Sequence, residues 1–222
     1  MLQGEFEYRE WGGPRKGAGR KPKGERALVS HGVRERLARR FPVHVTTRLR
    51  AGLPKLRQRG EYRVLRAAFA KGCARFGFRL VHYSVQNNHL HMLVEAKDRA
   101  ALSKGMQGLL IRVAKALNKL WARKGGVFAD HYHDHILRTP REVRNALCYV
   151  LHNAKKHGLR IAEGLDFYSS GWWFDGWREQ PEITGTDRLE TPVAAPRTWL
   201  LGTGWRRSRL LSLFEAPLPH LA

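Results

Sequence analysis

Two histidines separated by one residue, His89 and His91, have the types and spacing best suited to chemistry in this sequence. The surrounding segment, residues 86–95, predicts a tight turn that leads into a β-strand. Because side chains alternate along a strand, both imidazoles point to one face while the apolar residues between and after them point into a core. Two neutral imidazoles held side by side on a rigid strand form half of a metal site.

Tyr149 and Asn153 form a second group suited to chemistry, on a helix predicted from Pro140 to about His157. The apolar stripe of that helix marks the side that faces the core. At 100° per residue, Tyr149 lies about 145° from the centre of the stripe and Asn153 about 105° from it. A phenol and an amide that project together beside a cationic helix surface suggest a nucleophile and a polar ligand, although a surface tyrosine would show the same pattern.

The charge of the chain indicates its partner. Its 222 residues include 41 Lys and Arg against 19 Asp and Glu, a formal net charge of +22. Self-repulsion of that size favours a polyanionic partner, either nucleic acid or an anionic membrane. The sequence has no run of about eighteen apolar residues and carries Glu5, Glu7 and Glu10 near its start, which argues against a membrane anchor. Two cysteines are too few for a disulfide scaffold, so we expect a cytoplasmic protein.

The order of the predicted elements indicates the fold. The hydrophobic pattern predicts strands at 43–49, 78–85 and 89–95, a short strand within 127–137, and helices at 62–76, after Asp98 and from Pro140. The order β-α-β-β-α-β with a final helix predicts an α+β fold, a ferredoxin-like antiparallel sheet with helices on one face. The opposite face would carry a polar set suited to an ionic or nucleic acid ligand, namely His44, Thr46, Arg48, His82, Ser84, His89 and His91.

Three segments are predicted along the chain: a flexible basic arm at 1–40, a folded domain at 41–158, and an extension containing Trp and Arg at 159–222. The arm can enter an A·T-rich minor groove or act as a solubilising tail. Indoles beside arginines in residues 198–207 can stack unpaired bases or dock the extension on the domain, and docking is favoured. The predicted DNA-binding residues are Arg15, Lys16, Arg20, Lys21 and Lys23 in the arm, His44, Arg48, Arg112 and Lys156 in the domain, and Arg206 and Arg207 in the extension.

The combination of these features resembles the single-tyrosine HUH transposases, and among them the REP-associated tyrosine transposases of bacteria. The resemblance covers about residues 42–158. It is carried by VHVT at 43–46, NHLHMLV at 88–94 and YVLHN at 149–153, which agree in order and spacing. The resemblance implies a metal-dependent enzyme that cleaves and rejoins single-stranded DNA through a 5′-phosphotyrosine intermediate at hairpin-forming repeats.

The same resemblance implies a role for each residue of the site. Tyr149 would be the catalytic nucleophile, and His89, His91 and Asn153 would hold Mg²⁺ or Mn²⁺. The usual family wording near the tyrosine is Asn-Pro-Val, whereas this chain has Asn153 followed by Ala and Lys. The ligand position is kept, and only the local helix geometry is affected. The implied partner is single-stranded or hairpin DNA, and both the homodimer and the monomer stay open as assemblies.

Alternatives to this site and this activity follow from the same residues. His131, His133 and His135 share one side of a predicted strand and could bind zinc. His152 could replace Asn153 as the third ligand, although it lies about 100° around the helix from that residue. The alternative functions are a non-catalytic DNA- or RNA-binding regulator and a nuclease that uses activated water. Neither would form a protein–DNA covalent link.

Overall fold

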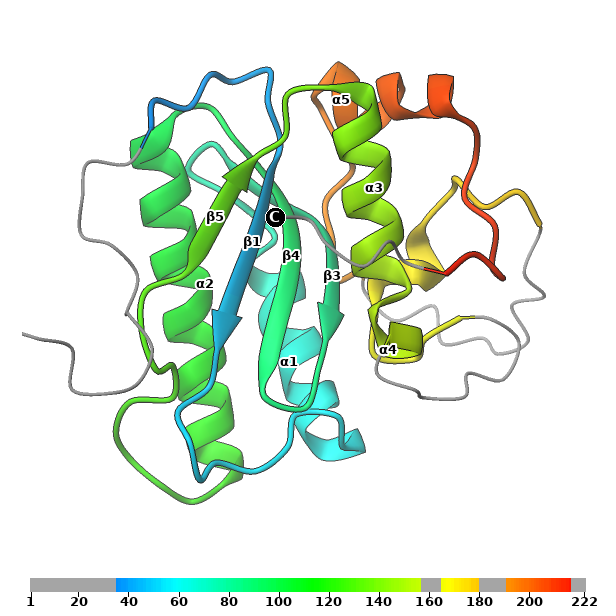
Figure 1. The fold of residues 1–222 in the computed structure, drawn as a ribbon. Coiled ribbons are helices and arrows are strands. Elements are labelled where there is room, and N and C mark those ends of the chain that lie inside the picture. Colours follow the sequence, from blue (N-terminus) through cyan, green and yellow to red (C-terminus); the bar gives the residue numbers. More distant parts are fainter. Residues whose placement is uncertain (1–34, 157–164, 180–190, 217–222) are drawn as a thin grey trace, which may run out of the picture. The chain divides into compact units, whose positions relative to one another are not determined.

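A five-stranded antiparallel sheet forms the centre of the molecule, in the order β2-β3-β4-β1-β5 (Figure 1). This computed structural model describes residues 35–156, 165–179 and 191–216, so the predicted cations of the basic arm lie outside the described residues. Residues 32–222 form one compact unit. The strands are β1 (Val43–Arg48), β2 (Ala74–Arg75), β3 (Phe78–Val85), β4 (His89–Ala96) and β5 (His133–Ile136).

Two long helices, α1 (Arg59–Gly72) and α2 (Arg99–Leu120), cover one face of the sheet. The helix predicted after Asp98 is α2, and the Asp98 side chain caps it by accepting a hydrogen bond from the backbone of Ala101 at 2.7 Å. The helices and the sheet bury an apolar core between them, and the α+β prediction is confirmed. None of the helices in the described part of the chain is both long and apolar enough to cross a bilayer.

The opposite face of the sheet carries α3 (Pro140–Leu151), which begins with a capping box formed by Thr139 and Glu142. Three short helices of the C-terminal extension pack on the same side: η2 (Ser170–Trp173), α5 (Trp199–Gly202) and η3 (Gly204–Ser208). Together they bury a second apolar cluster that includes Leu147, Leu201 and Trp205. This face is therefore covered in part, whereas the sequence predicted an open surface.

A β-bulge in β3 changes which side chains reach each face. The register with β4 shifts between Leu80 and His82, so Val81 is the extra residue. Leu80 joins the core below α1 and α2, and Val81 joins the cluster beneath α3, the reverse of the alternation predicted from sequence. His82 and Ser84 keep their predicted face but are buried, because the η2 segment lies over them.

The helix that carries Tyr149 is shorter than predicted. It ends at Leu151 rather than near His157, and the backbone N–H of His152 closes the last turn onto the carbonyl of Cys148. A separate short helix, α4 (Asn153–Lys156), follows immediately. Tyr149 and Asn153 therefore lie on two consecutive helices instead of one continuous helix.

Candidate active site

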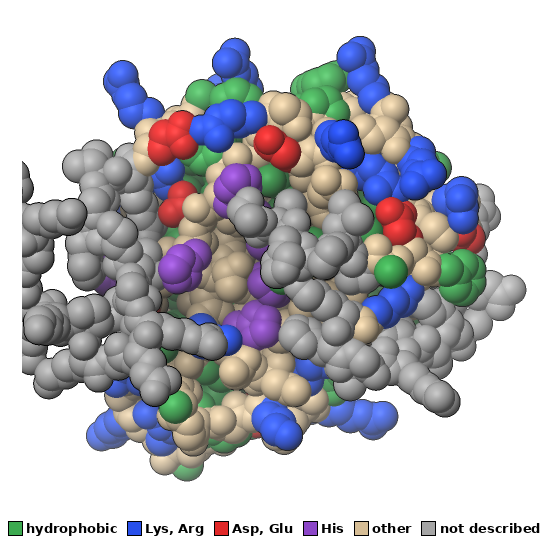
Figure 2. All heavy atoms as spheres, in the orientation of Figure 1, with side chains coloured by type: hydrophobic (Ala, Val, Ile, Leu, Met, Phe, Trp, Pro, Cys, Tyr) green, Lys and Arg blue, Asp and Glu red, His purple; other side chains and the backbone are tan. Residues whose placement is uncertain are grey.

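The histidine pair begins β4, near the centre of the sheet, on the face opposite α1 and α2. In the register with β1, His89 pairs with Arg48 and His91 pairs with Thr46. Figure 2 shows histidine side chains gathered on this face, in the same orientation as Figure 1. As predicted, the intervening Leu90 points into the core below the sheet.

Tyr149 of α3 extends toward this pair. The centre of its ring lies 5.1 Å from that of His91 and 5.8 Å from that of His44, both in edge-to-face geometry. The rings of His44 and His91 stack at 5.4 Å, and the ring of His89 lies 4.8 Å from that of His91. Three elements distant in sequence, β1, β4 and α3, thus place a phenol against a cluster of three imidazoles.

Two hydrogen bonds orient the paired imidazoles. Nδ1 of His91 lies 3.1 Å from the hydroxyl of Thr46, and Nδ1 of His89 lies 2.8 Å from Oδ1 of Asn88. An amide oxygen only accepts, so the bond to Asn88 places the proton of His89 on Nδ1 and its lone pair on Nε2. Such bonds to the distal nitrogen are typical of histidines that bind metal ions. The turn motif before β4 was the signal that could have assigned the role of Asn88. The pairing of β4 with β1 was the signal that could have assigned the role of Thr46.

His44, which was predicted to contact DNA, is part of this cluster. Its side chain is buried, and this burial, together with the neighbouring His135, lowers its pKa to about 4. The imidazole is therefore neutral near pH 7, so it adds no positive charge for a phosphate. It lines the space beside Tyr149 and His91.

Asn153, the predicted third ligand, is fully buried at the start of α4. Neither its Oδ1 nor its Nδ2 has a hydrogen-bond partner among the described residues. A buried amide in that state is costly unless a further group satisfies it, and a bound cation would satisfy the oxygen. Two imidazole nitrogens and one amide oxygen fit Mn²⁺ or Mg²⁺ in ligand chemistry.

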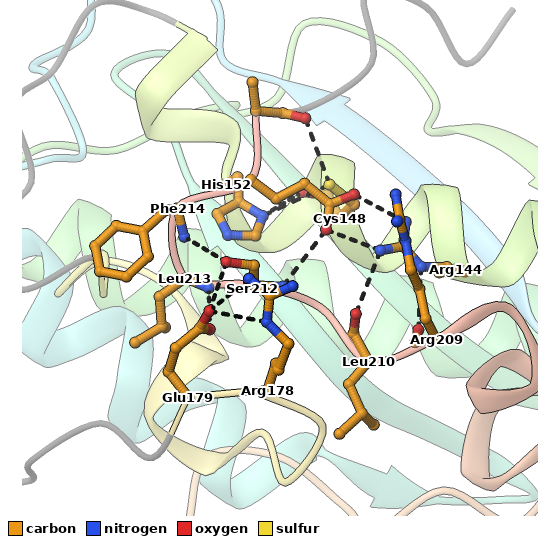
Figure 3. Close-up of polar contacts among 12 residues, drawn as sticks. Arg144, Cys148, His152, Arg178, Glu179, Arg209, Leu210, Ser212, Leu213 and Phe214 are labelled. Atoms are coloured by element: carbon orange, nitrogen blue, oxygen red, sulfur yellow. Dashed lines mark hydrogen bonds and ion pairs between the residues drawn. The ribbon is translucent and has the colours of Figure 1, made fainter.

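The structure also places the alternative ligands. Nδ1 of His152 lies 3.1 Å from the carbonyl oxygen of Cys148 in α3 (Figure 3), and its ring packs against Trp177. Nε2 of His152 is buried and, like the Asn153 amide, has no hydrogen-bond partner among the described residues. His131, His133 and His135 are exposed. Within residues 35–156, 165–179 and 191–216, no three His, Cys, Asp or Glu side chains form a group able to hold a metal ion. The zinc alternative is therefore not supported.

The predicted DNA-binding residues are spread over the molecule. Arg48 is exposed across the strand pair from His89. Arg112 lies on α2, in the helix layer behind the sheet, so the structure does not bring it to the histidine face. Arg206 forms an ion pair with Asp175 at 2.7 Å, whereas Arg207 is exposed. Lys156 is the last residue of α4.

The tryptophans of the extension divide between the two predicted roles. Trp205 is 1% exposed and packs in the cluster beneath α3, as expected for docking. Trp199 is 51% exposed at the start of α5, with the guanidinium of Arg207 5.1 Å from its ring centre. Docking of the extension therefore accounts for Trp205, whereas packing does not account for the exposed face of Trp199.

Comparison with known proteins relates the folded domain to a family. Residues 43–150 match the family model described as IS200-like transposase, a range that includes His89, His91 and Tyr149 but ends before Asn153. By this match, residues 43–150 of the chain are a domain similar to the IS200-like transposases. The transposase is therefore an enzyme that acts on DNA. A search of curated proteins gave no match.

Two solved structures resemble the transposase. One is a REP-associated tyrosine transposase solved with a REP hairpin, which is 18% identical over 65% of this chain and 84% of that chain, with a TM-score of 0.53. Another is a protein of Deinococcus radiodurans R1 described as a transposase, 14% identical over 50% of this chain and 87% of that chain, with a TM-score of 0.38. At 18% identity the first likeness supports the fold alone.

Proposed function

We propose that the transposase cleaves and rejoins single-stranded DNA with Tyr149 as its nucleophile. The observation that carries the proposal is the 5.1 Å approach of the Tyr149 ring to His91, across two elements that are far apart in sequence. Tyr149 is half-buried: part of its side chain packs against the apolar cluster beneath α3, and its ring faces His91 and His44. The ring of Tyr149 reaches His91 of its own chain, so we propose that the nucleophile and the histidine pair of one site come from the same chain.

The reaction follows from the chemistry of a phenol beside a phosphate. The Tyr149 oxygen attacks the scissile phosphorus and loses its proton, a new O–P bond forms, and the bond from phosphorus to the 3′ oxygen breaks. The 3′ oxygen takes up a proton and leaves as a hydroxyl, while the protein keeps the 5′ end. Attack by another 3′-hydroxyl reverses the step and joins new strands. The energy of the phosphodiester is conserved, so no nucleotide triphosphate is needed.

His89, His91 and Asn153 would hold a divalent cation, Mg²⁺ or Mn²⁺, which when bound neutralises charge on the scissile phosphate. Thr46 and Asn88 would keep the imidazoles in the geometry that such binding needs. The exposed Arg48 lies beside His89 and is placed to contact the strand that enters the site. We further propose hairpin-forming repeats as the substrate, since a structural relative was solved with a REP hairpin.

Substitution of Tyr149 tests the nucleophile. The probe is a 3′-labelled single-stranded oligonucleotide that carries the inverted repeats flanking the reading frame, incubated with Mn²⁺ and analysed on a denaturing gel. The wild-type chain should give a protein–DNA adduct, and Tyr149→Phe should reduce it below detection while keeping its DNA affinity. An adduct in the variant would refute the assignment, and nicked DNA with no adduct from the wild type would indicate the water-activated nuclease.

Removal of the metal tests the ligand set. Chelation with EDTA should stop adduct formation, and added Mn²⁺ should restore it. Asn153→Ala should weaken Mn²⁺ binding in titration calorimetry, while Asn153→Asp, which keeps an oxygen ligand, should retain it. Equal Mn²⁺ affinity in Asn153→Ala and the wild type would remove Asn153 from the site. Adduct formation that persists in EDTA would contradict metal dependence.

A further inference from the structure

A basic groove lies at the opposite end of β4 from His89, with a cavity volume of about 880 Å³. Its walls come from four places: the segment before β1, the turn between β2 and β3 with the ends of those strands, the end of β4, and the residues that lead into α5. Six cationic side chains line it: Arg39, Arg40, Arg75, Arg79, Lys97 and Arg197. This groove is separate from the histidine cluster.

The positive charge of the groove is mostly uncompensated. Glu95 is its one acidic lining residue, and this carboxylate is 3% exposed. It accepts hydrogen bonds from the backbone N–H groups of Arg197 and Thr198 and from the Thr198 hydroxyl, each at 2.8 Å, and lies 3.9 Å from Nε of Arg79. The other five cations form no ion pair with a carboxylate in the described part of the chain. A polyanion would offset this excess.

Trp199 stands at the rim of the groove as a fixed aromatic surface. A Cβ added at Gly204 would lie 2.7 Å from its ring, so the indole packs directly on that backbone. Thr198 caps α5 by accepting from the backbone N–H of Leu201 at 3.2 Å, which holds the first turn in place. Half of the side chain remains exposed. An indole that is held on one side and open on the other is suited to stacking against a base.

Phe76 forms a second exposed aromatic surface on the other wall. It occupies the two-residue turn Phe76-Gly77 between β2 and β3, and its side chain is 77% exposed. Both residues have positive φ, 54° at Phe76 and 76° at Gly77, a conformation that favours Asn-Gly in such turns. A phenylalanine there is strained and leaves its ring in water, so neither local geometry nor burial explains the residue.

We propose that this groove binds an unpaired stretch of the DNA substrate, with phosphates on its cations and bases stacked on Trp199 and Phe76. The combination of aromatic platforms with a cationic track is the arrangement that suits single strands. Glu95 lies four residues further along β4 than His91, a span of about 13 Å, and Leu93 between them is buried beneath α3. The proposal rests on the proposed function for the identity of the strand, which would run from the Tyr149 site to the groove.

The test measures binding alone, in a Tyr149→Phe background, so that it does not depend on cleavage. The probe is a fluorescent thymidine oligonucleotide of about 20 residues, compared with a blunt duplex of the same length. Phe76→Gly relieves the strained turn, so it should keep or raise stability while weakening single-strand binding by about five- to a hundredfold. Trp199→Ala should weaken it to a similar extent.

Matched controls separate the groove from general surface effects. Phe214 is also 77% exposed but lies outside the groove, and Phe214→Ala should bind the oligonucleotide as the parent does. Arg75→Gln should lower the slope of log affinity against log salt by about 0.7, whereas Lys104→Gln on the outer side of α2 should leave it unchanged.

The outcomes separate this proposal from the preceding one. Unchanged binding in both Phe76→Gly and Arg75→Gln would overturn the groove assignment, and so would an equal loss for the duplex and the single strand. Neither result would bear on the adduct that tests Tyr149. Conversely, an adduct that survives Tyr149→Phe would refute the nucleophile while leaving the groove measurement intact.

Discussion

At the scale of single residues, Thr46 illustrates how the candidate metal ligands are oriented. Its hydroxyl lies 3.1 Å from Nδ1 of His91, in the neighbouring strand. If His91 binds a cation through Nε2, the proton resides on Nδ1 and the hydroxyl accepts it. One hydrogen bond then selects both the tautomer and the rotation of the ring.

We expect Thr46→Val to lower Mn²⁺ affinity by about 10- to 100-fold, because valine keeps the shape of threonine and removes the acceptor. Titration calorimetry of the purified chain with Mn²⁺ measures this change. Thr46→Ser retains the hydroxyl and should retain most of the affinity. Wild-type affinity in Thr46→Val would mean that the hydroxyl does not orient the ligand.

At the scale of elements, α3 is held by the C-terminal segment that crosses it. Figure 3 shows Arg144 of α3 surrounded by acceptors from that segment. Its guanidinium donates to both carboxylate oxygens of Glu215, at 2.9 and 2.8 Å, and to the carbonyl of Arg209 at 3.1 Å. Arg144 is 7% exposed, so these bonds are shielded from water. They anchor the side of α3 that carries Arg144, and Tyr149 extends from the same helix.

Arg144→Met should therefore lower the free energy of unfolding by about 2–4 kcal/mol, since the Glu215 carboxylate and the carbonyls of Arg209 and Leu210 lose the guanidinium donor. Urea denaturation measures this loss. The exposed Arg141 on the same helix provides the control, and Arg141→Met should change stability by about 0.5 kcal/mol or less. Adduct formation should also slow in Arg144→Met, because the position of Tyr149 depends on α3. Equal stability of the two variants would show that the hydrogen bonds of Arg144 contribute nothing to the free energy of unfolding.

At the scale of the whole molecule, buried histidines make stability depend on pH. Burial lowers the pKa of His82 to about 3 and is the main cause that lowers the pKa of His44 and of His152 to about 4. All three folded-state values lie below the unfolded value near 6.5, so the unfolded chain binds more protons as the pH falls below that value. The free energy of unfolding should therefore keep its full value above about pH 6.5 and should decline as the pH falls toward 4.

As the pH falls from 7 to 5, each of these buried histidines should lower the free energy of unfolding by about 2 kcal/mol. Urea midpoints across this range measure the decline. His82→Gln should remove about a third of it, because glutamine does not titrate. A pH profile of His82→Gln that parallels the wild type would show that His82 is not buried in its neutral form.

The sequence alone determined the features that depend on neighbours in the chain. Asp98 and Thr139 mark the starts of two helices because each side chain accepts a hydrogen bond from the backbone N–H three residues later. The alternation of residue types around His89 and His91 predicts a strand with one buried face. The order of the elements then limits the sheet to few arrangements, which is why the α+β fold was predictable. Tyr149 could be singled out because it lies about 145° from the centre of the apolar stripe of its helix.

Tertiary structure decided what depends on distant contacts. The bulge at Val81 exchanges the faces of Leu80 and Val81 in β3. No local sequence pattern predicts this bulge, because it forms only when β3 pairs with β4. The burial of His82 comes from a segment nearly ninety residues away, at Ser170. Likewise, Phe76 and Trp199 meet at one groove only because the turn after β2 and the start of α5 converge in space. Such convergence is set by packing of the whole chain, so local sequence carries no signal of it.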